Sequence, residues 1–246
     1  MHQSRGSPDE KTEDGPEDTV ENVTQTSSPP RTRKPRGEYA KTGAKRMAIL
    51  DAALEVFAES GYRSGSLRDV AGKVGMSEAG LLHHFPNKSA LLAAVLDRRD
   101  QHSLEFVHFD DEDGAVALRG LVELAVYNAS VPGVVELYCV LSAEATAPDH
   151  PAHEYFIGRY DYTRANLRQA FETLERDGRL MAGVTPQGAA VATIAMMDGL
   201  QVQWLLDRDV IDMAEELKGF LGAFVDVDFS DLRVITDAGE SPADSV

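Results

Sequence analysis

Between residues 41 and 227, apolar residues recur mainly at intervals of three and four, the spacing that lines one face of an α-helix. The first such stripe consists of Met47, Leu50, Leu54 and Phe57. Gly61 is expected to end this helix, because the residue just past a helix end commonly needs a positive φ angle. No segment alternates apolar and polar residues for long enough to predict a strand. The pattern therefore predicts an all-α fold.

Glycine and proline residues divide the rest of the chain into further helices. These are expected at about 67–74, 78–84, 88–107, 114–129, 133–146, 152–177, 186–207 and 211–227. Ser66 and Ser77 stand where N-capping residues would begin the first two of them.

The segment from Leu67 to Phe85 has the spacing of a helix-turn-helix motif. Ala71 supplies a small side chain where two helices cross, and Gly75 allows the short turn between them. Leu81 can pack the second helix on the first, which leaves the start of the second helix free to enter the major groove of DNA. An ordinary helical hairpin would show the same three residues.

The charge distribution bears on whether this motif meets DNA. The 246 residues carry a net charge of −17, which would oppose binding to a polyanion if it were evenly spread. It is not: residues 1–30 carry −5, residues 31–105 carry +4, and residues 106–246 carry −16. The motif therefore lies in the one basic part of the chain.

The two ends of the chain are predicted to be tails. Residues 1–30 have few large apolar side chains and are expected to be disordered, and the polar residues from about 230 are expected to form a second tail. The run from Arg31 to Arg36 holds four basic residues, which favours either a solvated linker or an arm that contacts DNA.

Three segments of the chain resemble the DNA-binding domain of TetR-family (tetracycline-repressor-like) transcriptional regulators. They are ILDAALEVFAESGY (49–62), LRDVAGKVGMS (67–77) and HHFPNKSALL (83–92). The resemblance implies a disordered tail with a basic arm at 1–40, a helix-turn-helix domain at 41–87, a helical effector-binding and dimerisation domain at 88–229, and a tail at 230–246. It implies a repressor that binds a palindromic operator as a dimer and is released by a small molecule.

The same resemblance assigns phosphate contacts to Lys88, Ser66 and Arg68, and base reading to the segment 77–84. Two positions depart from the family pattern: Leu82 replaces a common tyrosine, and Gly80 replaces a threonine or serine. His84 is interpreted as a packed residue more than a base reader. The full predicted DNA-binding set is Arg33, Lys34, Arg36, Ser66, Arg68, Ser77, Glu78, Ala79, Gly80, Leu82, His83, His84 and Lys88.

The body is expected to dimerise through its last two helices and to hold the effector among the helices at about 106–205. The predicted lining is Phe106, Phe109, Tyr127, Tyr138, Cys139, Tyr160, Met197, Gln201 and Trp204. Each of these residues could equally be part of an ordinary core. Because the body holds many acids and few bases, an apolar ligand that is neutral or cationic is favoured over an anionic one.

Other functions are weighed against this one. The chain has no motif of a hydrolase, metalloprotease, P-loop or dinucleotide-binding enzyme, so neither catalysis nor a cofactor is expected. The lone Cys139 excludes an internal disulfide and suits the cytoplasm. The longest apolar run is about half of a membrane span. His150 and His153 are interpreted as part of a surface loop, not a metal site. A helical interaction module without DNA, or a regulator without a small-molecule ligand, remains an alternative.

Overall fold

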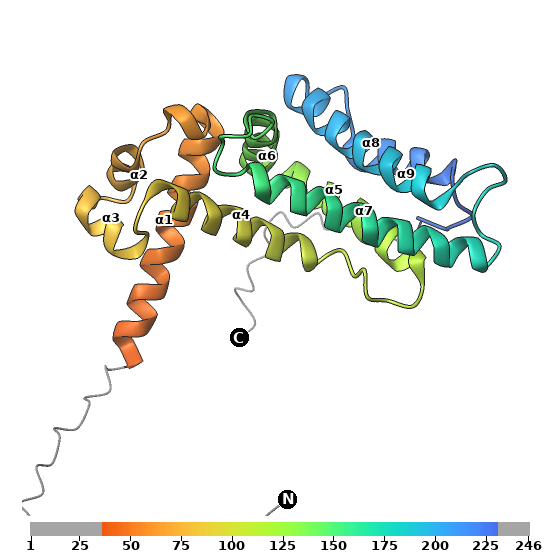
Figure 1. Cartoon of the computed structure of the whole chain (residues 1–246), viewed down its shortest axis with the longest axis horizontal. Coiled ribbons are helices and arrows are strands. Elements are labelled where there is room, and N and C mark those ends of the chain that lie inside the picture. The colour runs from red at the N-terminus through yellow and green to blue at the C-terminus, as the bar shows by residue number, and fades with distance from the viewer. Residues whose placement is uncertain (1–35, 231–246) are drawn as a thin grey trace, which may run out of the picture.

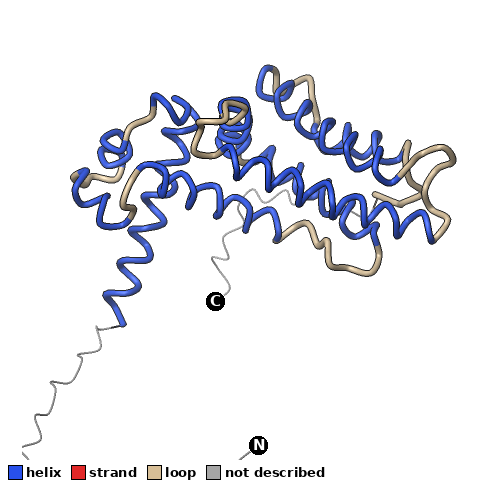
Figure 2. The backbone as a smooth tube through the Cα atoms, in the orientation of Figure 1, coloured by secondary structure: helices blue, strands red, loops and turns tan. Residues whose placement is uncertain are grey.

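The computed structural model describes residues 36–230, with side chains from Thr42 onward, and this part of the chain contains nine α-helices and no strand. The helices are α1 (Arg36–Ser64), α2 (Leu67–Lys73), α3 (Glu78–His84), α4 (Lys88–Leu104), α5 (Gly114–Ser130), α6 (Pro132–Glu144), α7 (His153–Arg176), α8 (Pro186–Leu206) and α9 (Met213–Gly222). We call α1–α3 the head and α5–α9 the body. Figure 1 shows α4 running from the head along the body, and Figure 2 shows the loops between helices. The all-α prediction is confirmed.

The helix ends follow local chemistry. Ser66, Ser77 and Asn87 each accept a hydrogen bond from a backbone N–H of the first turn of α2, α3 and α4, as N-caps do. Gly75 has a φ of 62° in the turn between α2 and α3. The predicted stop at Gly61 is a break within α1: this residue has φ 69° and ψ 174°, and a short helical segment continues to Ser64.

The last helix was expected at about 211–227, and this prediction was wrong at its C-terminal end. Asp212 caps α9, which therefore begins at Met213. The helix ends at Gly222 because the following residues pair with the loop before α8. Val225 forms an isolated antiparallel bridge with Leu180, and the amide of Asp226 donates to the Arg179 carbonyl at 2.8 Å.

The described residues bury two apolar cores. One lies among α5, α7, α8 and α9, with Leu118, Leu167 and Phe171 fully buried. The other contains head residues such as Ile49 and Phe57 together with residues of α4 and α6 and the beginning of α7. The body therefore supplies part of the core around which the head folds.

Helix α8 stands out for its hydropathy. It is long and apolar enough to cross a membrane, with a mean hydropathy of 1.3, and the bent pair α5–α6 meets the same test when it is treated as one span. Core helices of globular proteins also meet this test. Here α8 packs against α7 and α9, so its composition alone is weak evidence for a membrane span.

Candidate functional site

The head presents one short helix to its surroundings. Leu81 of α3 is fully buried and belongs to the same core as Val70 and Ala71 of α2, so the opposite side of α3 faces outward. The exposed residues of this segment are Ser77, Glu78, Ala79, Leu82 and His83, whereas Gly80 and His84 are half-buried. This is the arrangement in which a second motif helix can enter a DNA groove.

Cationic side chains surround this helix and also tie the head together. Arg46 donates to the His84 carbonyl at 2.9 Å and lies over the Phe85 ring, so it holds the end of α3. Lys45 donates in the same way to the Val74 carbonyl at the end of α2. Such contacts satisfy helix-end carbonyls that have no partner within the helix.

The predicted phosphate-contacting residues differ in their settings. Arg68 is exposed on α2, and Ser66 caps that helix. The Lys88 amine instead donates to the Arg63 carbonyl at 3.3 Å and lies 4.4 Å from the centre of the Tyr62 ring. Partial burial lowers the pKa of Lys88. Of the predicted arm, Arg33 and Lys34 lie outside the described residues, and Arg36 is the first residue of α1.

A buried junction connects the head to α6. The Glu144 carboxylate accepts a hydrogen bond from the Tyr62 amide at 2.8 Å, immediately after the break at Gly61. His150, which follows α6, packs its ring edge-on against Tyr62, and its Nε2 lies 3.5 Å from Glu144. The exposed-loop prediction for His150 was wrong, because only 4% of this residue is exposed. Burial lowers its pKa.

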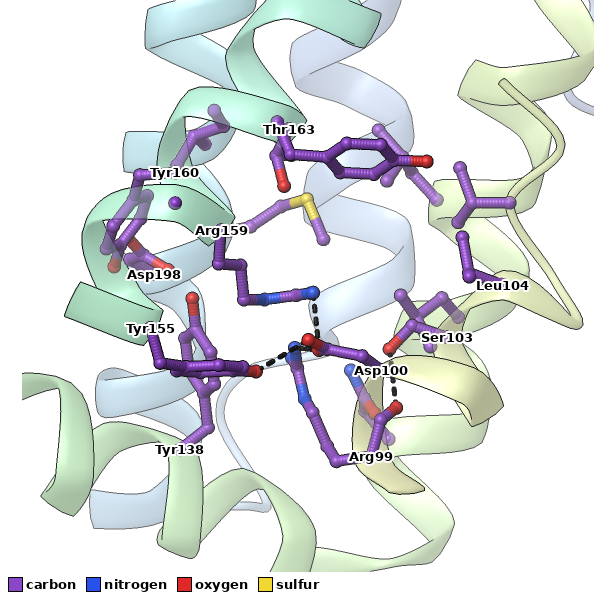
Figure 3. Close-up of a pocket in the computed structure, with 18 of the residues that line it drawn as sticks. Arg99, Asp100, Ser103, Leu104, Tyr138, Tyr155, Arg159, Tyr160, Thr163 and Asp198 are labelled. Carbon is purple, nitrogen blue, oxygen red and sulfur yellow. Dashed lines mark hydrogen bonds and ion pairs between the residues drawn. The ribbon is translucent and has the colours of Figure 1, made fainter. Parts of the chain in front are cut away.

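The body and α4 form a partly open cavity of about 410 Å³, a size typical of small-molecule sites. Helices α4, α5, α6, α7 and α8, with the loop after α4, supply its walls. Figure 3 shows part of this lining. Of the predicted lining residues, the structure brings Phe109, Tyr138, Tyr160, Met197 and Gln201 together here.

The other predicted lining residues lie elsewhere. Tyr127 borders a second cavity of about 190 Å³ beside α1 and stacks on Phe106 at 5.0 Å between ring centres. Trp204 is buried in the body core, where Arg208 covers its ring. Cys139 points its thiol toward Gln201, with Sγ 3.9 Å from the amide oxygen. Apolar spacing predicted that these residues are inside the body but not which of them border the cavity.

The cavity also contains a charged cluster that the sequence analysis missed. Asp100 of α4 accepts hydrogen bonds from Arg159 and Tyr155 of α7, at 2.5 and 2.8 Å. The guanidinium of Arg99 lies 3.3 Å from the same carboxylate and covers the Tyr138 ring at 4.1 Å. Figure 3 shows these side chains converging on Asp100. The expectation of few bases inside the body does not hold for this cavity.

A second carboxylate lies on α8. Asp198 accepts a hydrogen bond from the Tyr160 hydroxyl at 2.8 Å. Burial raises the pKa of Asp198 and also that of Tyr160. The cavity thus combines apolar walls with a few polar groups on one side, which is the usual make-up of a ligand site.

Two features bear on nucleophilic and metal chemistry in the described part of the chain. Burial raises the pKa of the Cys139 thiol to about 11, so little of it is the reactive thiolate at neutral pH. Within residues 36–230, no group of three or more histidine, cysteine or acidic side chains is arranged to hold a metal ion. The Nδ1 atom of His153 is engaged with the Ala145 carbonyl at 2.7 Å.

Comparison with known families accounts for both parts of the molecule. Residues 49–95 match the family described as bacterial regulatory proteins, tetR family. Residues 134–226 match the family described as BetI-type transcriptional repressor, C-terminal. The first match covers the helix-turn-helix, and the second covers most of the body.

Individual regulators are similar to the chain over different lengths. The regulator RutR of Escherichia coli is 45% identical over 53 residues, which are 22% of this chain and only a quarter of RutR. The regulator TtgR of Pseudomonas putida is 25% identical over 211 residues, 79% of this chain and 95% of TtgR.

Solved structures extend the likeness to the fold. NalD of Pseudomonas aeruginosa, described as the secondary repressor of the MexAB-OprM multidrug efflux pump, is 25% identical with a TM-score of 0.58, over 75% of this chain and 98% of NalD. GusR of Salmonella enterica gives the same identity and TM-score over 73% of this chain and 94% of that chain.

Proposed function

This chain belongs to the TetR family of DNA-binding transcriptional regulators, and we propose that it is a cytoplasmic repressor that binds a palindromic operator as a dimer and is released by a small molecule in its body cavity. The observation that carries the proposal is the pairing of an outward-facing α3 with a 410 Å³ cavity beside α4, the helix that leads from the head. The description of NalD as a repressor supports repression, as opposed to activation, for this chain.

DNA reading is assigned to the exposed start of α3. Ser77, Glu78 and Ala79 occupy its first exposed positions, with His83 one turn further along. Arg68 at the start of α2 adds a cation toward the phosphate backbone, and Lys88 adds another if it leaves the Arg63 carbonyl. Base edges specify the sequence, whereas these cations supply affinity that weakens with salt.

Of the last two helices, α9 buries Met213, Leu217 and Leu221 within the chain, so dimerisation is assigned to α8 and the adjoining loop. Their exposed apolar residues are Val191, Val202, Leu206 and Val210, with Leu206 82% exposed. A second copy related by a two-fold axis would cover this face and place two α3 helices on successive turns of DNA, about 34–36 Å apart. Val202→Glu should therefore yield a monomer in sedimentation velocity. An unchanged dimer would place the interface elsewhere.

A gel shift on the DNA upstream of the chain's own gene tests the main proposal. The wild-type protein should shift this DNA, and Arg68→Ala combined with Lys88→Ala should weaken binding and lower the salt slope by roughly two. Arg176→Ala, at the far end of α7, is the matched control and should leave binding unchanged. A double variant that folds and binds like the wild type would remove these residues from the interface.

A further inference from the structure

We propose that the cavity takes an amphipathic effector that carries a carboxylate, and that Arg99 and Arg159 bind this group. The inference rests on the proposed function, in which the cavity holds the effector. It follows from an imbalance of charge on one wall and from the apolar character of the remainder.

The imbalance is centred on Asp100. Its Oδ1 atom accepts from Arg159 at 2.5 Å and lies 3.3 Å from a nitrogen of Arg99, while its Oδ2 atom accepts from the Tyr155 hydroxyl at 2.8 Å. One carboxylate thus contacts two guanidinium groups and a phenol hydroxyl. Two positive charges face a single negative charge at this wall.

Arg99 is the less well compensated of the two cations. Its side chain is only 8% exposed, and its contact with Asp100 is the longer one, made to its own neighbour in the chain. Burial, followed by the charge of Arg159, lowers the pKa of Arg99. For Arg159, burial also opposes the charged form, yet Asp100 together with Tyr138 and Tyr155 raises the pKa overall. The Asp100 carboxylate therefore compensates mainly the charge of Arg159. Apart from the Tyr138 ring that it covers, Arg99 has only a share of one carboxylate, and a buried cation in this setting favours an anionic ligand.

Two further acids line the cavity: Glu154 of α7, which is exposed, and Asp198 of α8. The Asp198 carboxylate accepts its hydrogen bond from the Tyr160 hydroxyl, and burial raises its pKa although the charges of Arg99 and Arg159 act to lower it. Among the ion pairs of the described residues, none within 4.0 Å joins Glu154 or Asp198 to Arg99 or Arg159. A carboxylate from outside the chain can therefore pair with these two arginines.

The rest of the cavity selects an apolar body for the ligand. Leu104, Val107 and Phe109 approach from the end of α4 and the following loop, and Leu121, Ile194 and Met197 from α5 and α8. A guanidinium pair can hold a carboxylate by several charge-assisted hydrogen bonds, while the apolar walls cover a hydrocarbon chain. Figure 3 shows the polar cluster on one side of this space.

Three probes of equal chain length test the proposal by isothermal titration of the full-length chain at pH 7.5, below their micelle-forming concentrations: decanoate, decanol and decyltrimethylammonium. Decanoate is ionised at this pH. It should bind at least tenfold more tightly than either of the others. Equal or tighter binding of the ammonium or the alcohol overturns the proposal, as does a lack of binding by all three.

Two variants test whether Arg99 and Arg159 bind the carboxylate. Arg159→Gln and Arg99→Gln should each weaken decanoate binding at least tenfold and change decanol binding by less than twofold. Arg164→Gln, an arginine of the same helix α7 that does not line the cavity, is the matched control and should change neither. Decanoate affinity within twofold of wild type in both cavity variants would also overturn the proposal. The order of affinity of the three probes is measured on the wild-type protein, so this part of the test does not depend on the folding of any variant.

The outcome is separable from that of the proposed function. The gel shift is measured without any probe, so DNA binding with no carboxylate preference overturns only this inference. Carboxylate binding without any DNA shift supports this inference and overturns the repressor proposal.

Discussion

Replacing Gly61 with alanine should weaken the connection between the head and α6. The residue has φ 69° and ψ 174°, a conformation that is essentially restricted to glycine, and forcing alanine into it costs on the order of 1–3 kcal/mol. A Cβ atom would also lie 2.4 Å from the Oε1 atom of Glu144, so this carboxylate must move away. It would then release the Tyr62 amide, whose bond to a charged group contributes about 1.5–3 kcal/mol.

The two parts of this cost can be separated by a double-mutant cycle with Glu144→Ala. In the wild-type background Gly61→Ala includes both costs, about 2.5–6 kcal/mol in total. In the Glu144→Ala background only the backbone cost remains. The coupling should therefore be about 1.5–3 kcal/mol, or about 3–12 °C in thermal midpoint for a protein of this size.

Thermal unfolding followed by circular dichroism measures all four proteins. Gly178→Ala is a useful reference, because this glycine has a φ of 70° but no atom within 4 Å of the added Cβ. If Gly61→Ala lowers the midpoint equally with and without Glu144, the carboxylate contact does not stabilise the junction and the reasoning is refuted.

Three further predictions concern the arm, the junction and the body. Deleting residues 1–36 should weaken operator binding without changing the preferred sequence and should flatten its salt dependence; an identical salt titration would exclude the arm from DNA. Because burial lowers the pKa of His150 below its usual 6.5, the unfolded chain takes up a proton more readily, so stability should fall from pH 7.5 to 5.5. His150→Phe should reduce this fall in thermal midpoint, and an unaltered pH profile would contradict the assignment. Gly120→Ala should cost about 1–3 kcal/mol in chemical unfolding, since its Cβ would lie 2.2 Å from a backbone oxygen, whereas Gly158→Ala, with open space around it, should be neutral or stabilising.

The sequence allowed the helices to be placed well, because their apolar spacing and capping residues are local signals. Ser66 and Ser77 do cap α2 and α3, and Gly75 makes the turn between them. The end of α9 could not be placed in the same way, since it depends on a bridge between Val225 and Leu180, 45 positions apart in the chain.

The cavity was predicted only in outline. Tyr138 and Met197 could be chosen because large apolar residues are expected inside the body, but the same rule also selected Trp204, which is core. Arg99 and Arg159 were missed because charged residues on helices usually face water. Their common partner Asp100 is adjacent to one and 59 positions from the other, so no local pattern connects them.

The shared core of the head and α6 limits how such proteins can exchange parts. Leu137 and Leu141 of α6 are fully buried in the same cluster as Phe57 and Leu81, so a recombination breakpoint just after α3 would separate side chains that pack as one unit. A chimera that takes only α1–α3 from a relative should fold poorly. One that also takes α4, α6 and the start of α7 keeps this core whole but carries the donor's Arg99, Asp100 and Arg159 positions with it. The operator-reading helix and part of the proposed effector site would then be inherited together.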